Sequence, residues 1–268
     1  MALAEDEREP EGEVEGDVDG AVEGEEASPA VKRVYGTIVI IGGGCYGSYY
    51  VRQLRRASAS SAVRFERLLV VDRDASCAAA KTIDRDLELR VAEWRDFLDV
   101  FLADEARSAD AIVPSPLMPH LLFQWIERRA RDRWPERRVA VSLPGSIAGI
   151  PWQREGHDGT RYVSFAEWIC PVNCIEPRIC PHTRGERTWS MPPALAAHVA
   201  IARGAGEPLE ASAVLHCTHR AYGVGMIDVP DILAAERTVA MAADGRRAAI
   251  LIGTVSHCHG AIGTLTID

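Results

Sequence analysis

The sequence has 268 residues, of which 47% are hydrophobic and 26% charged, and its formal net charge is −9. This length fits one large or two small globular domains, which can bury enough apolar surface to fold without disulfides or metals. Twelve acidic residues and one arginine lie within residues 1–30, so the rest of the chain is nearly neutral and lacks the field that recruits nucleic acid or an anionic membrane.

Residues 1–32 form a low-complexity acidic tail, for which we predict disorder because like charges repel and little apolar surface offsets the entropy of ordering. The tail is a solubilising extension or, alternatively, a segment that binds a partner. The chain contains no run of about 20 apolar residues, and its acidic start is unlike a signal peptide. We therefore expect a cytoplasmic protein without a membrane segment, whose seven cysteines are thiols or ligands.

Strands and helices alternate in the pattern from residue 33 to residue 145. The expected strands are 35–41, 67–72, 88–91, 109–113 and 138–143, and the expected helices are 45–56, 93–102 and 120–131. This alternation predicts an α/β fold with a Rossmann-type parallel sheet over 33–145. Acidic residues interrupt the arginine-dense stretch 127–138, which favours a solvated helix face over a nucleic-acid patch.

The pattern is less regular from residue 146 to residue 268, for which we expect a C-terminal α+β portion. The expected strands are 161–165, 211–218 and 248–255, and the expected helices are 193–203 and 229–243. This portion should close over a cofactor bound by the first domain and bind a small-molecule substrate or redox partner. A homodimer completed through this portion is a further candidate.

A G-x-G-x-x-G pattern follows the first apolar strand and opens the first helix. The first glycine permits a tight turn, the second lets the backbone approach a pyrophosphate, and the third allows close packing of helix on strand. Free N–H groups at the start of a helix can then hold the phosphates. The candidate cofactor-binding residues of this turn are Gly42, Gly43, Gly44, Cys45, Tyr46 and Gly47.

The second strand ends in Asp72, where the fingerprint places an acidic residue that binds the ribose hydroxyls. A carboxylate there favours NAD, whereas the adjacent Arg73 could pair with the 2′-phosphate of NADP, so both cofactors stay open. Ser115 follows the fourth strand, where a Rossmann loop borders the nicotinamide, and it is either a cofactor contact or an ordinary loop residue.

The segment 37–72 resembles the NAD(P)-binding Rossmann superfamily, in particular the nucleotide-binding modules of potassium-uptake regulators and siroheme-type dehydrogenases. The resemblance covers about half of the globular part and implies a nicotinamide cofactor but no particular substrate. Flavin and S-adenosylmethionine proteins use related turns, and they rank lower because the chain has no second flavin motif.

A loop rich in cysteine and proline contains Cys170, Cys174 and Cys180, followed by His182. Prolines stiffen such a loop, and Cys-Pro steps resemble part of a ferredoxin loop, although the C-x3-C-x5-C spacing differs from C-x2-C-x2-C. Thiolates with imidazole suit an iron–sulfur cluster or zinc. The fourth ligand would be His182, Cys217 or Cys258, while the alternative is that these cysteines are small buried residues.

Two His-Cys groups, 216–219 and 257–259, follow predicted strands, where open α/β sheets place their ligand crevice. His219 and His257 are the candidate proton donors, because imidazole titrates near neutral pH. The sequence therefore predicts an NAD(P)-dependent oxidoreductase with a Cys/His-ligated metal or iron–sulfur centre. The alternatives are a non-catalytic NAD(H)-sensing regulator with a structural zinc site and an NAD-dependent enzyme whose zinc is purely structural.

Overall fold

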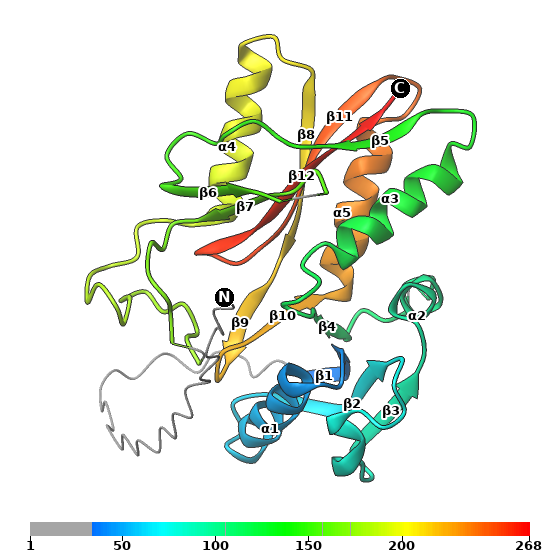
Figure 1. Ribbon diagram of the computed structural model, residues 1–268, viewed down its shortest axis with the longest axis vertical. Helices are drawn as coiled ribbons and strands as arrows, with labels where there is room; N and C mark the ends of the chain where they lie inside the picture. Colours follow the sequence, from blue (N-terminus) through cyan, green and yellow to red (C-terminus); the bar gives the residue numbers. More distant parts are fainter. Residues whose placement is uncertain (1–33, 105, 157, 172) are drawn as a thin grey trace, which may run out of the picture. The chain divides into compact units, whose positions relative to one another are not determined.

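The computed structural model describes residues 34–104, 106–156, 158–171 and 173–268, which belong to one compact unit. Within these ranges the chain forms a mixed α/β fold with two mixed sheets and five α-helices (Figure 1). The expected α/β class is thus confirmed. The acidic tail predicted for 1–32 lies outside the described residues. None of the described helices is long and apolar enough to span a membrane.

The first sheet has the strand order β3-β2-β1-β4-β10-β9. Its first four strands are parallel neighbours, β10 runs antiparallel to β4, and β9 pairs with β10. The central strand β1 is buried along most of its length, which explains its continuous apolar run. The bounds are β1 Val34–Ile41, β2 Arg64–Asp72, β3 Leu87–Val91, β4 Ala111–Val113, β9 Thr218–Ala221 and β10 Val224–Asp228.

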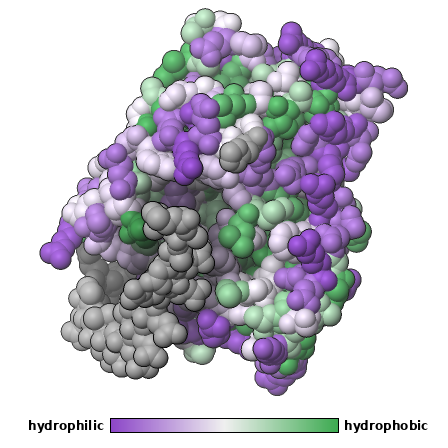
Figure 2. Space-filling model, in the orientation of Figure 1, coloured by the Kyte–Doolittle hydropathy of each residue, from purple (hydrophilic) through white to green (hydrophobic). Residues whose placement is uncertain are grey.

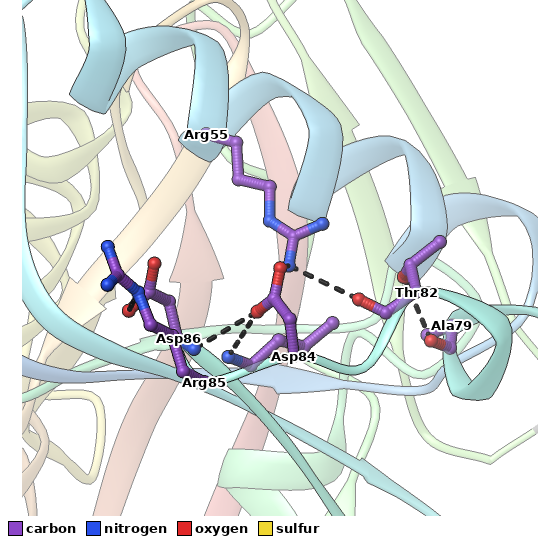
Figure 3. Close-up of polar contacts among 7 residues, drawn as sticks. Arg55, Ala79, Thr82, Asp84, Arg85 and Asp86 are labelled. Carbon is purple, nitrogen blue, oxygen red and sulfur yellow. Dashed lines mark hydrogen bonds and ion pairs between the residues drawn. The ribbon is translucent and has the colours of Figure 1, made fainter.

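Helical connections link the parallel strands of this sheet. Helix α1 (Cys45–Ala59) joins β1 to β2, a single 3-10 turn η1 (Ala78–Thr82) precedes β3, and α2 (Trp94–Phe101) leads to β4. Arg55 of α1 donates to Asp84 Oδ2 at 2.6 Å and to the Thr82 carbonyl at 3.2 Å (Figure 3). These bonds hold the β2–β3 connection against the helix that follows the glycine turn.

The second sheet has the order β6-β7-β12-β11-β8, and β5 also pairs with β12. Strands β8 and β11 are parallel, whereas the other pairs are antiparallel. The bounds are β5 Val139–Ser142, β6 Trp152–Glu155, β7 Arg161–Ser164, β8 Leu209–His216, β11 Ala248–Val255 and β12 His259–Ile267. The placement of strand 138–143 in the first, parallel sheet was wrong, because β5 pairs antiparallel with β12, more than 100 residues later in the chain.

Helices cover both faces of the second sheet (Figure 1). Alternate side chains of β11 point to opposite faces: Ile250 and Ile252 pack with α3 (Leu121–Arg133) and α5 (Val229–Ala242), whereas Leu251 packs with α4 (Met191–Gly204). The first of these clusters also contains Val39 and Val71 of the first sheet, so the two predicted portions share one core.

The arginine-rich helix α3 is neutralised by ion pairs on its surface. Arg128 pairs with Asp99, Arg131 with Glu127, and Arg133 with Glu236. Hydrophilic residues gather on the side of the molecule where α3 lies (Figure 2). These contacts agree with the solvated helix face expected from the interleaved charges.

The chain passes from the second sheet to the first at the residue that follows β8. The Cys217 amide donates to the Val255 carbonyl at 2.8 Å, and β9 and β10 then join the first sheet beside β4. Because β8 and β11 are parallel neighbours, the two His-Cys groups that follow them lie at the same sheet edge. Residues of this edge line a cleft together with Tyr50 of α1 and Ser115, and this cleft is the candidate site.

Candidate functional site

The three fingerprint glycines of the turn each meet a different steric requirement. Gly42 has a φ of +89°, which disfavours any side chain. A Cβ at Gly47 would lie 1.8 Å from the Gly42 carbonyl oxygen, whereas a Cβ at Gly44 would have no other atom of the described residues within 4 Å. Helix α1 therefore packs tightly on the turn while the backbone of Gly44 borders open space.

The start of α1 has donors without side-chain acceptors. Gly44 is the N-cap residue and has no side chain with which to cap the helix, and the first turn contains no acidic residue. Gly44, Cys45 and Tyr46 are exposed. The first N–H groups of a helix lack partners within it, so this end can bind an anion.

Asp72 lies beside the turn, where the sequence placed it. Its Oδ2 accepts from the Gly43 amide at 2.6 Å and its Oδ1 from the Asp74 amide at 2.9 Å. Each carboxylate oxygen has a second lone pair with which to accept from a ribose hydroxyl. The neighbouring Arg73 is exposed.

A cleft of about 780 Å3 is lined by residues of α1, of the loop after β4 and of the Cys/His segments. Tyr50 of α1 lines it, and so does Ser115, whose Oγ lies 4.0 Å from the position of a Cβ on Gly42. Burial is the main cause that raises the pKa of Tyr50 to about 12, so this phenol stays protonated at neutral pH. The volume falls within the range of small-molecule sites.

His219 is held in the cleft wall in a defined tautomer. Its Nδ1 lies 2.9 Å from the Cys174 carbonyl oxygen, which can only accept, so Nδ1 carries a proton. In the neutral ring Nε2 then has a free lone pair, and it lies over Gly225, where a Cβ would come within 3.1 Å. His219 can therefore accept a proton at Nε2 and return it to a molecule in the cleft.

His257, the other candidate proton donor, has a different environment. Its Nδ1 lies 2.7 Å from Ser190 Oγ, and its ring packs edge-on against His216 with centroids 4.7 Å apart. Of the described histidines, His219 and His259 line the cleft. The geometry therefore favours His219 over His257 and adds His259, which the sequence analysis did not single out.

Glu176 joins the cysteine loop to the β11–β12 turn. This carboxylate is only 6% exposed; its Oε1 accepts from Ser256 Oγ at 2.6 Å and from the Cys258 amide at 3.1 Å, and its Oε2 accepts from the His257 amide at 2.9 Å. Burial opposes its ionisation, yet the Ser256 hydroxyl and the nearby His219 lower its pKa overall. Sequence reasoning missed Glu176, since a lone glutamate in a loop has no distinguishing pattern.

Four thiols converge on a small pocket in the wall of the cleft. The residues that line it include Cys170, Cys174, Cys180 and Cys258. Its volume of about 10 Å3 admits a single water-sized sphere. Cys170 and Cys174 line both this pocket and the large cleft, whereas Cys217 lines the cleft.

N–H groups point at several of these sulfurs. The Glu176 amide donates to Cys174 Sγ at 3.3 Å, and Trp189 Nε1 donates to Cys258 Sγ at 3.3 Å. Burial opposes ionisation of Cys180, but hydrogen bonds from Thr183 lower the pKa of its thiol overall. Burial followed by the neighbouring Cys174 raises the pKa of Cys170. As they stand, no three His, Cys, Asp or Glu side chains of the described residues form a metal-holding group.

The structure thus distributes most of the predicted site residues over three regions: the glycine turn, the cleft and the small pocket. The glycine turn with Asp72 lies at one end of the first sheet, and Ser115 connects it to the cleft. The cleft contains His219 and Cys217, and the small pocket contains the loop cysteines, Cys258 and the exposed His182, which stacks on Trp168 with centroids 4.6 Å apart. His257 lies beside these regions in contact with Ser190.

One comparison with known proteins gives a match. Residues 122–268 match the AF_1314_C family, described as the C-terminal domain of an uncharacterized protein. No curated protein and no solved structure matches the chain. The matched region begins in α3 and contains the Cys/His residues of both pockets, and the glycine turn precedes it.

Proposed function

Since the chain belongs to the AF_1314_C family and carries a glycine turn upstream of the matched region, we propose that the protein is an NAD(P)-dependent oxidoreductase. The dinucleotide would bind at the turn, and a small-molecule substrate or redox partner would occupy the adjoining cleft. The observation that carries the proposal is the open backbone at Gly44 beside the closely packed Gly47.

The strand order supports a Rossmann-type arrangement for the first sheet. The parallel order β3-β2-β1-β4 is that of the first half of a doubly wound dinucleotide-binding sheet, in which ligands bind beyond the carboxyl ends of the strands. The glycine turn and Ser115 both follow such ends. In this sheet β10 pairs antiparallel on the far side of β4, so the second half of the sheet differs from the full Rossmann order.

The residues of the turn fit a dinucleotide. The free amides of Gly44, Cys45 and Tyr46 would hold the diphosphate, and Asp72 would accept from a ribose hydroxyl, which favours NAD. A bound nicotinamide supplies a hydride donor or acceptor. His219 would move the accompanying proton at Nε2, because its Nδ1 is held by the Cys174 carbonyl.

A turnover assay tests the proposal. Oxidation of NADH and NADPH is followed with quinone and carbonyl acceptors, and we expect a rate that rises in proportion to the amount of protein. Tight dinucleotide binding without turnover on any acceptor would contradict the enzyme and favour a nucleotide sensor.

We also expect bound dinucleotide to protect one cysteine from alkylation. Cys45 is exposed at the turn, whereas burial raises the pKa of Cys217 to about 12, which leaves little reactive thiolate. Iodoacetamide followed by peptide mass spectrometry should therefore modify Cys45 before Cys217, and NADH should slow only the reaction at Cys45. Equal labelling of Cys45 with and without either dinucleotide would place the ligand elsewhere.

A further inference from the structure

The small thiol-lined pocket is a second candidate site, separate from the glycine turn. Three of its cysteines, Cys170, Cys174 and Cys180, belong to the loop between β7 and α4. The fourth is Cys258 of the β11–β12 turn. We infer that Cys170, Cys174, Cys180 and Cys258 are the four ligands of a thiolate-bound metal centre, either zinc or an iron–sulfur cluster.

The convergence of four sulfurs from two distant segments is the first argument. Zinc and iron–sulfur clusters both take four thiolates. The pocket that these four cysteines line has room for one water-sized sphere, and Trp168 and three prolines complete its wall together with the polar residues Glu176, His182 and Arg187. Closing the coordination shell requires the loop to draw the thiols together, because they do not yet form a metal-holding group among the described residues.

The hydrogen bonds around the sulfurs are the second argument. Thiolates at metal centres are stabilised by N–H donors, and such donors tune the centre. The Glu176 amide and the Trp189 indole already donate to Cys174 and Cys258. Arg187, which lines the pocket and is fixed by its bond to the Trp189 carbonyl at 2.9 Å, would offset the net negative charge of four thiolates around a metal.

The geometry also selects among the fourth ligands that the sequence left open. Cys258 lines the pocket together with the three loop cysteines, whereas Cys217 lines the large cleft. His182 reaches the pocket but lies with its ring stacked on Trp168, with an angle of 6° between the planes. Cys258 is therefore the fourth ligand, and Cys217 serves as the matched control.

Metal analysis of the anaerobically purified full chain tests this inference. We expect about one zinc ion or one iron–sulfur cluster per chain, and a visible absorption spectrum distinguishes the two. Cys174→Ser and Cys258→Ser should each lose at least about nine-tenths of the metal, as expected when one ligand of a closed site is removed. Cys217→Ser should retain the metal.

A second measurement does not depend on the folding of any variant. Addition of Co2+ to chelator-treated wild-type protein should produce thiolate-to-metal absorption, and zinc should abolish it. The inference is overturned if the wild type contains no metal and gives no Co2+ spectrum, or if Cys217→Ser loses the metal while Cys258→Ser keeps it. Gly44→Asp should retain the metal, which separates failure of this site from failure of the dinucleotide site.

Discussion

Gly44→Asp should weaken the binding of NADH and NADPH by roughly 30-fold or more while the protein stays folded. A Cβ at this position meets no other atom of the described residues within 4 Å, so the backbone need not move. Aspartate is also a favourable N-cap residue, which would stabilise α1. Its carboxylate would take the amides that hold the diphosphate and repel the phosphates, a loss of about 2–3 kcal/mol, the usual worth of hydrogen bonds to charged groups.

The matched control for this variant is Gly145→Asp. Gly145 is also an exposed glycine with open space around its Cβ position, and it follows β5 outside the residues that line the cleft. Titration calorimetry of both variants and the wild type gives the affinities, and thermal unfolding verifies the fold. Wild-type affinity in Gly44→Asp would mean that the turn does not hold the diphosphate.

His219→Gln should lower kcat for dinucleotide oxidation by roughly 100-fold or more, the usual contribution of a positioned acid–base group. Glutamine can still donate to the Cys174 carbonyl, but its amide cannot exchange a proton near neutral pH. The affinity for the dinucleotide should change little, because His219 lies in the cleft beyond the glycine turn.

His198→Gln, on α4, is the control for the loss of an imidazole elsewhere in the chain. Its kcat should remain within about threefold of the wild type, since surface substitutions away from special features have small effects. If His219→Gln retains the rate of the control, another group in the cleft transfers the proton, and His259 is the next residue to replace.

Much of the glycine turn could be predicted from the sequence because it depends on local stereochemistry. The positive φ of Gly42, the contact at Gly47 and the position of Asp72 after a buried strand are all consequences of neighbouring residues. The proximity of the two His-Cys groups could also be expected, because each group follows a predicted strand and the carboxyl ends of parallel strands lie at the same sheet edge.

The remainder of the fold depends on pairings between distant segments. Strand β5 has an apolar pattern that suits either sheet, and its partner β12 lies beyond the His-Cys group at the end of the chain. Hairpin β9–β10 joins the first sheet only because the chain crosses over at Cys217. Hydrophobic periodicity identifies such strands but does not name their partners.

Glu176 is a residue of the site whose distant partners could not be predicted from the sequence either. It is buried by the turn that contains Ser256, and its three donors come from residues about 80 positions later. Nothing near it in the sequence indicates this role. The choice between the two candidate proton donors likewise needed their contacts in the structure. The ring of His219 is hydrogen-bonded to the Cys174 carbonyl in the cleft, whereas the ring of His257 is hydrogen-bonded to Ser190.

The proposed oxidoreductase activity depends on the amides at the start of α1, which would hold a dinucleotide. The most direct test is a crystal structure of the full chain grown with NADH. We expect diphosphate density against the amides of Gly44, Cys45 and Tyr46, with the adenosine ribose beside Asp72. Density for the dinucleotide at another surface, or a turn without ligand when NADH is present at saturating concentration, would contradict it.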